Sequence, residues 1–239
     1  MAGQSAERQE TGFIDAVNNA VAKKGSVTVV AGSTRINNVV RAAKYTGRQL
    51  TGSEPYTDVQ LFIKNKTKPV NISMKGTSAP SLAGGGLKGL ELAVPGLAKK
   101  FMRKVLEHLK ITVKLKPGQK VPDVYGRISE ADKKTIVVGN EAMGGPIDYM
   151  YVGPMDVTSQ LSSTNLILNG AMTSAVDFAK SHNLYFRLRA RREDQTFDPT
   201  AVDSQGAPKI YGRSPSRGDS AGRIVVTDSV PRNAQTVTF

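Results

Sequence analysis

Two short segments of alternating polarity, separated by five polar residues, constrain the fold of this chain more than any other feature. In residues 57–63 and again in residues 69–75, apolar side chains recur at every second position, which is the period of a strand with one buried face. The residues between them, 64–68, read Lys-Asn-Lys-Thr-Lys and are turn-like, so the two segments predict a hairpin. If the register is right, its polar side carries Asp58, Asn71, Ser73 and Lys75.

The rest of the chain mixes helical and strand patterns. Apolar residues at helical spacing predict amphipathic helices over residues 7–22, 97–110 and 163–181. Alternating or β-branched runs predict strands over residues 27–30, 111–116, 134–139, 149–152, 184–191 and 223–227. Residues 36–45 fit either a strand or a helix, and the mixture as a whole predicts an α/β fold.

Changes in composition along the chain predict its domain organisation. We expect one α/β domain over residues 1–192, with a Gly-rich and basic insertion over about 76–140. Residues 193–239 are rich in Asp, Ser, Pro, Gly and Arg and predict a loop-rich C-terminal extension. The run Gly84-Gly85-Gly86 lacks the Gly-x-x-x-x-Gly-Lys-Ser/Thr pattern of a P-loop, which favours a flexible connector.

The balance of charges narrows the classes of partner and chemistry. The chain of 239 residues has 33 Lys and Arg against 20 Asp and Glu, a formal net charge of +13, which favours a polyanionic partner such as nucleic acid. It has no Cys and only two His, His108 and His182, which excludes disulfides and thiolate zinc sites and leaves little room for a Ser-His-Asp triad. No apolar run approaches the roughly 20 residues of a membrane span, and no signal peptide opens the chain, so we expect a soluble protein.

The polar side of the hairpin has the residue types of a metal-dependent phosphodiesterase. A carboxylate such as Asp58 binds a divalent cation, and hard oxygen ligands suit magnesium. The cation stabilises charge on the scissile phosphate, while a nearby Lys such as Lys75 orients the attacking water or lowers its pKa.

At these residues the sequence resembles the PD-(D/E)xK nuclease superfamily. The resemblance rests on Pro55-Tyr56-Thr57-Asp58, on Ser73-Met74-Lys75, and on the run ISMKG followed by SLAGGGLKGL, which is similar to phage-encoded restriction-like or homing endonucleases. It implies a restriction-endonuclease-like mixed sheet flanked by helices. The leading helix would be 7–22, and the trailing helix and strand would be 163–181 and 184–191.

The pattern departs from this family at Ser73, where the family usually has Asp or Glu, so one metal ligand is missing. Glu10, near the apolar stripe of the first helix, is the best replacement, because some members recruit an acid from the leading helix; alternatively Glu10 only complements the helix dipole. Three further acids stay open as alternatives. They are Asp123 in the literal Pro-Asp pair Pro122-Asp123, Glu141, which has no Lys two residues later, and Asp148 at a strand end.

Two basic faces are the best candidates for phosphate contacts. Arg187, Arg189 and Arg191 alternate on one side of the segment 184–191. The helix over 97–110 adds a second set, Lys99, Lys100, Arg103 and Lys104. Both His residues are expected to be structural or solvated.

These features together predict a magnesium-dependent (or manganese-dependent) endodeoxyribonuclease encoded by a phage. In this interpretation Asp58 and Glu10 bind the metal, Lys75 activates water and Ser73 lines the site. We expect the protein in the cytoplasm of an infected bacterial host or in a virion, as a homodimer or a larger assembly. The alternative is a non-enzymatic DNA-binding or virion structural protein that keeps a degenerate nuclease fold.

Overall fold

The computed structural model describes residues 2–52, 54–77, 86–189, 196–202, 206, 208, 210 and 223–239. The chain divides into two compact units, each built from two separate segments. The first unit comprises Met1–Pro80 and Val137–Ser181, and the second comprises Ser81–Ile136 and His182–Phe239. Most of the expected insertion and all of the expected C-terminal extension therefore belong to the second unit.

The first unit contains an eight-stranded mixed sheet in the order β7-β8-β1-β2-β3-β4-β6-β9. Its strands are β1 (Val27–Ala31), β2 (Thr34–Lys44), β3 (Val59–Ile63), β4 (Val70–Gly76), β6 (Tyr149–Gly153), β7 (Ser159–Ser162), β8 (Asn165–Leu168) and β9 (Ala171–Ser174). The pairs β1–β8 and β4–β6 are parallel, and the other neighbours are antiparallel. The mixed α/β class expected from the sequence is confirmed.

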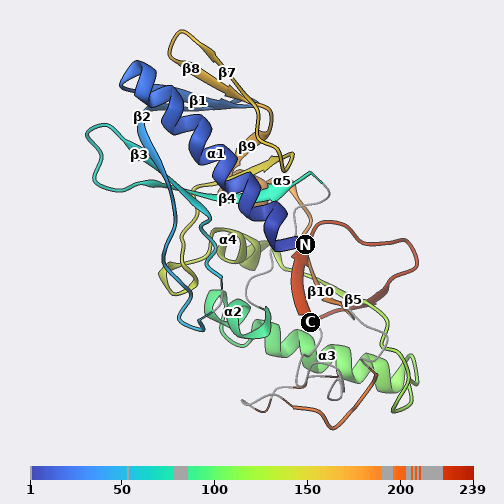
Figure 1. The fold of residues 1–239 in the computed structure, drawn as a ribbon. Helices are drawn as coiled ribbons and strands as arrows, with labels where there is room; N and C mark the ends of the chain where they lie inside the picture. Colours follow the sequence, from blue (N-terminus) through green and yellow to red (C-terminus); the bar gives the residue numbers. More distant parts are fainter. Residues whose placement is uncertain are drawn as a thin grey trace. The chain divides into compact units, whose positions relative to one another are not determined.

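Helix α1 (Ala2–Lys24) covers one face of this sheet (Figure 1). Its predicted apolar stripe is buried, with Phe13 and Val17 at 0% exposure, because it packs on the apolar side chains of β1, β2 and β4. Phe13 also meets Tyr151 of β6 edge-to-face at 5.3 Å between ring centroids. The helix ends in Lys23 and Lys24, which suit the negative end of its dipole.

The predicted hairpin is confirmed, and it fixes the register of the sheet. Val59 pairs with Ile72, and Gln60 pairs with Asn71, so the alternating apolar side chains Val59, Leu61, Ile63, Ile72 and Met74 face α1, while Phe62 and the polar side chains face away. The segment that fitted either a helix or a strand is strand β2, which continues the sheet beyond β3. Its pairing with β3 shifts between Val39 and Arg41, one residue beyond the positive φ of Asn38.

The helix predicted over 163–181 is wrong except at its end. Ser163 adopts a positive φ in the turn between β7 and β8, and β8 adds a parallel strand beside β1. Only Ala175–Ser181 is helical, as α5, which contacts β6 and β9. The helical spacing of apolar residues arose from two short strands followed by one short helix.

The strands predicted over 111–116 and 134–139 are also wrong. Residues 112–116 form no strand, and residues 134–138 lie in helix α4 (Glu130–Val138), which is followed by the short 3-10 helix Glu141–Met143. Ser129 Oγ accepts a hydrogen bond from Asp132 N at 3.2 Å and so caps α4. The β-branched run Ile136-Val137-Val138 is helical because this cap and the burial of Ile136 and Val137 outweigh its intrinsic preference for a strand.

The second unit holds a four-stranded sheet in the order β11-β10-β5-β12. Its elements are α2 (Gly86–Ala93), α3 (Leu97–Ile111), β5 (Val124–Arg127), β10 (Tyr185–Arg189), β11 (Arg223–Thr227) and β12 (Gln235–Val237). The predicted apolar stripe of α3 is buried, and the Phe101 ring lies 5.5 Å from Phe186 of β10 and 5.2 Å from Phe239. These aromatic contacts join the helix, the sheet and the chain end of this unit.

Candidate active site in the first unit

Asp58 lies directly before β3, and the backbone of the hairpin fixes its position. Asp58 N donates to Ile72 O at 2.9 Å. Its carboxylate oxygen Oδ2 accepts a short hydrogen bond of 2.6 Å from Met74 N and a second of 3.1 Å from Ser73 Oγ. Both hydrogen bonds and the ion pair of this side chain use Oδ2, so Oδ1 is the atom available for a cation.

Lys75 completes a three-residue cluster on the same polar side of the hairpin. Its Nζ donates to Ser73 Oγ at 2.8 Å and to Met74 O at 3.0 Å, and it lies 3.7 Å from Asp58 Oδ2. The side chains of Lys75 and Asp58 are 19% and 23% exposed, so solvent and a ligand can reach both. Ser73, only 2% exposed, bridges them by donating to the carboxylate and accepting from the ammonium group. The structure therefore brings together the three hairpin residues that the sequence singled out, and their catalytic roles remain predictions.

Glu10 lies near this cluster but is paired with another residue. Its Oε2 is 2.9 Å from Lys44 Nζ, on the last residue of β2. Burial raises the pKa of Glu10, and the negative charge of Asp58 raises it further, while the hydrogen bond and charge of Lys44 lower it. Glu10 raises the pKa of Lys44 in turn. Glu10 and Asp58 thus sense each other electrostatically, and Lys44 neutralises Glu10.

Gln9 is a site-positioning residue that the sequence analysis missed. It is 1% exposed, and its Nε2 contacts three backbone oxygens, Gly153 O at 2.8 Å and Lys75 O and Pro154 O at 3.1 Å. These contacts fix the first turns of α1 against the ends of β4 and β6, beside Lys75. The available signal was a polar residue four positions before Phe13, on the buried stripe of the helix.

The alternative acids lie in different surroundings. Asp148 Oδ2 accepts from Asn71 N at 2.8 Å, so this carboxylate lies at the start of β4 and is bound to its backbone. Glu141 is exposed in the 3-10 helix. Asp123 belongs to the second unit and forms an ion pair with Arg187.

The predicted phosphate contacts of the second unit are only partly available. Arg187 Nε donates to Asp123 Oδ2 at 3.0 Å and its guanidinium lies 5.6 Å from the centre of the Tyr125 ring, so its charge is compensated. Arg189 is exposed, and Arg191 lies outside the described residues. On α3, Lys100 and Arg103 are exposed, Lys99 is half-buried, and Lys104 pairs with Glu107 at 2.8 Å.

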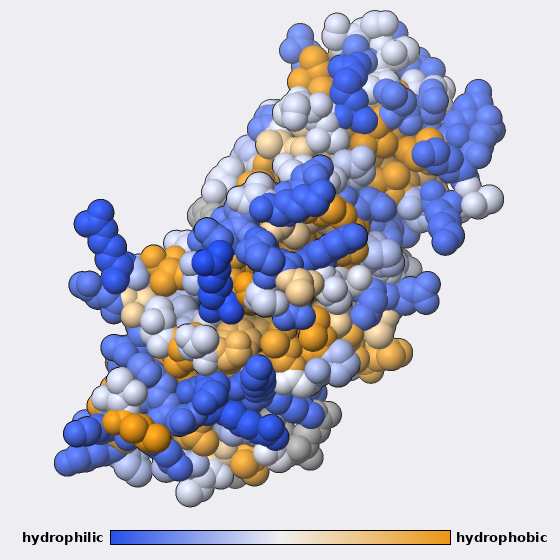
Figure 2. Space-filling view, turned by 180° about the vertical axis from the view of Figure 1, so that it is seen from behind, coloured by the Kyte–Doolittle hydropathy of each residue, from blue (hydrophilic) through white to orange (hydrophobic). Residues whose placement is uncertain are grey.

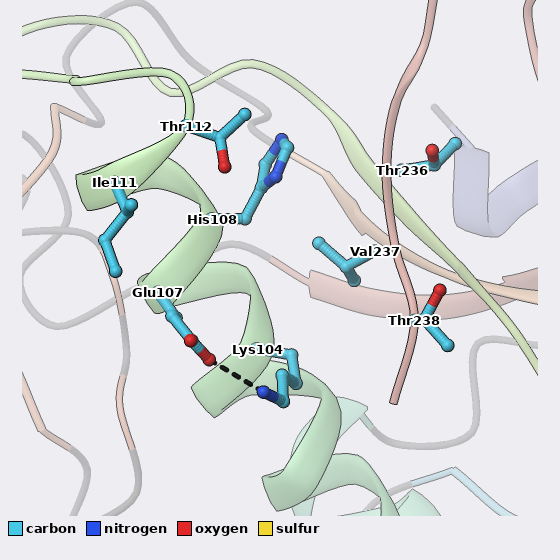
Figure 3. A pocket seen from close by; sticks show the side chains of 8 residues that line it. All are labelled: Lys104, Glu107, His108, Ile111, Thr112, Thr236, Val237 and Thr238. Atoms are coloured by element: carbon cyan, nitrogen blue, oxygen red, sulfur yellow. Dashed lines mark hydrogen bonds and ion pairs between the residues drawn. The ribbon is translucent and has the colours of Figure 1, made fainter.

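A shallow, open hollow of about 270 Å³ lies between the end of α3 and residues 236–238 (Figure 3). His108 lines it, and its Nε2 lies 2.9 Å from Gln235 Oε1 of β12. Its charged lining side chains Lys104 and Glu107 pair with each other, and Ile111 exposes an apolar side chain at its edge. In this unit His182 Nε2 lies 3.8 Å from Asp228 Oδ2.

Within the described ranges, no three His, Cys, Asp or Glu side chains gather as a metal-binding group. Magnesium keeps several waters and often uses only one or two carboxylates. Asp58 and Glu10 are close enough for their charges to interact, although Asp58 shares the side of the hairpin that faces away from α1 and Glu10 lies on α1 itself. In the same ranges, no helix combines the length and apolar character that a membrane crossing requires.

No known protein family matches the chain, and no curated protein sequence or solved structure is significantly similar to it.

Proposed function

We propose that the protein is a magnesium-dependent endodeoxyribonuclease of the PD-(D/E)xK type, encoded by a phage, with its active site on the β3–β4 hairpin. The observation that carries the proposal is the cluster of Asp58, Ser73 and Lys75, joined by contacts of 2.8, 3.1 and 3.7 Å. A structural hairpin gains little from an ion pair of this kind, because exposed or partly exposed pairs contribute about 0–1 kcal/mol. A carboxylate that can hold a cation and an ammonium group beside it are two of the groups that a metal-dependent phosphodiesterase uses.

In this proposal each residue has a separate role. Asp58 Oδ1 and Glu10 would hold the cation, and magnesium, when bound, would stabilise negative charge on the scissile phosphate. Lys75 orients the attacking water through Nζ. Ser73, which stands where the family usually has an acid, holds Lys75 and Asp58 in position through its hydroxyl instead of binding metal.

The second candidate function is a non-enzymatic DNA-binding or virion structural protein. It is favoured by the pairing of Glu10 with Lys44, which offsets the charge of the replacement carboxylate. Under this alternative the hairpin cluster is a remnant of a nuclease site.

Plasmid nicking separates the two candidates. Supercoiled plasmid is incubated with the full chain in magnesium, in manganese and in EDTA, alongside the variants Asp58→Asn and Lys75→Met. The matched controls are Asp15→Asn and Lys23→Met, which make the same chemical changes at exposed positions of α1. We expect nicking that needs metal, that persists in both controls and that both site variants lose.

Calorimetric titration of magnesium and manganese then tests the metal ligands. Asp58→Asn and Glu10→Gln are expected to weaken binding to a similar extent, because each removes one anionic oxygen ligand. A wild-type protein that neither nicks plasmid nor binds either ion would refute the nuclease and leave the structural alternative.

A further inference from the structure

The face of the large sheet opposite α1 is open over β8, β1, β2 and β3. Its side chains are half-buried or exposed, in contrast to the buried side chains that face the helix. Figure 2, turned by 180° from the view in which α1 lies in front, shows hydrophobic patches between hydrophilic side chains over this part of the molecule. The exposed or half-buried residues of this open face are Thr28, Val30, Arg35, Asn37, Arg41, Gln60, Phe62, Asn165 and Ile167.

Contacts across the strands hold the polar side chains of the open face in place. Arg35 Nη2 donates to Asn165 Oδ1 at 2.8 Å, and the guanidinium carbon of Arg41 lies 3.9 Å from the centre of the Phe62 ring. Both partners are uncharged, so each guanidinium keeps its full positive charge. Because the partners order these side chains in the free protein, a ligand would lose less entropy on binding them.

The strands of this face carry no carboxylates of their own. No strand of the eight-stranded sheet contains Asp or Glu, and the chain has no acidic residue between Asp15 and Glu54. Among the described residues neither Arg35 nor Arg41 forms an ion pair. Three further exposed cations, Lys64, Lys66 and Lys68, lie in the turn between β3 and β4.

We propose that this open face is a docking surface for duplex DNA, with Arg35 and Arg41 as its phosphate contacts. A positively charged surface without carboxylates is complementary to a phosphate backbone, and amide and hydroxyl groups such as those of Asn37 and Thr28 are common partners of phosphate and sugar oxygens. A second copy of the chain fits less well. A two-fold interface would place the same cations on both sides, with no acid to compensate them.

The register of the sheet relates this surface to the hairpin site, a step that rests on the proposed function. Tyr45 N donates to Asp58 O, so Tyr45, just after the end of β2, lies beside Asp58 and serves as the starting point for distances along β2. Arg41 is four regular positions from Tyr45, and Arg35 is about eight, because the pairings of β2 with β3 and β1 each skip one residue between them; at about 3.3 Å per position these are about 13 and 26 Å. At about 3.4 Å per nucleotide along one strand, the two arginines would meet phosphates about four and eight nucleotides from the cleaved bond.

Binding is tested without cleavage, in EDTA, by the fluorescence anisotropy of a labelled 30-base-pair duplex between 50 and 200 mM KCl. The double variant R35Q/R41Q is compared with K23Q/K24Q, which removes two charges from the exposed end of α1. Losing two phosphate contacts makes the slope of log K against log salt less steep by about 2. The fold-decrease in affinity between 50 and 200 mM KCl is then about ten times smaller than in wild type. We expect this change in R35Q/R41Q and a wild-type slope in K23Q/K24Q.

A single substitution provides a second test in case the double variant does not fold, and shortened duplexes test the distances from the cleaved bond to Arg35 and Arg41. Asn37→Asp adds a carboxylate at an exposed position and is expected to weaken binding as well. Arg35→Gln is expected to matter only for duplexes that extend about eight nucleotides beyond the cleaved bond, and Arg41→Gln for those that extend about four.

The outcomes separate this surface from the proposed function. Equal slopes in the two double variants overturn the docking surface, even if wild type cleaves plasmid. DNA binding that depends on Arg35 and Arg41 supports the surface even if wild type cleaves nothing. A wild-type dimer that R35Q/R41Q alone disrupts in sedimentation velocity, with unchanged DNA affinity, assigns the face to a second copy and overturns the proposal.

Discussion

Replacing Gln9 by Leu should destabilise the first unit by about 2–3 kcal/mol. The side chain is 1% exposed, and its Nε2 contacts the oxygens of Lys75, Gly153 and Pro154. Leu has a similar size but no donor, so at least two hydrogen bonds are lost and their acceptors stay buried. Each such loss costs about 1–3 kcal/mol, and the added apolar contacts of Leu offset part of the sum.

Urea unfolding followed by circular dichroism measures this change. With an m-value of about 1–3 kcal/mol per molar urea, the midpoint should fall by about 0.7–3 M. Gln160→Leu makes the same chemical change at an exposed position of β7 and should alter stability by less than about 0.5 kcal/mol. A Gln9→Leu midpoint indistinguishable from wild type would show that the amide does not fasten α1 to the strand ends.

Two further substitutions address buried polar groups of the same unit. The Tyr56 hydroxyl is buried with no hydrogen-bond partner among the described residues, so Tyr56→Phe should leave the thermal midpoint unchanged or raise stability by about 1 kcal/mol; a clear loss would reveal a bound partner. Burial raises the pKa of Glu10, so the folded state binds a proton at this carboxyl more tightly than the unfolded state does. As pH rises from about 4.3, the pKa of an unfolded Glu, towards the raised pKa, the free energy of unfolding therefore falls. Glu10→Gln should therefore gain stability relative to wild type across that window in urea titrations at several pH values, and a constant difference would contradict this sign.

The hairpin could be predicted because strand period and register are local properties of the sequence. Once Val59 pairs with Ile72, the alternation alone places Asp58 beside Ser73 and Lys75 on the side away from the helix. The position of Glu10 was harder to predict, because Lys44 comes from the segment whose secondary structure the pattern left undecided.

The wrong segments are those in which apolar spacing or β-branched composition conflicts with turn and cap residues nearby. In 163–181, Asn169-Gly170 separates two strands, yet Leu168, Ala171, Met172 and Ala175 also match a helix. In 134–139 the β-branched residues pointed to a strand, although Ser129 and Asp132 form the start of a helix. The grouping of segments into two units depends on contacts between residues far apart in the chain, which no local pattern encodes.

The chain order of the large sheet has a consequence during synthesis. Strand β4 ends at Gly76, and its parallel neighbour β6 begins about 70 residues later, at Tyr149. At about 5–20 residues per second, a ribosome takes about 4–15 s to make that interval. Throughout it the nascent hairpin presents one unpaired edge, including Ile72 and Met74, to any other chain nearby. High expression should therefore favour aggregation of incomplete chains over misfolding of finished ones.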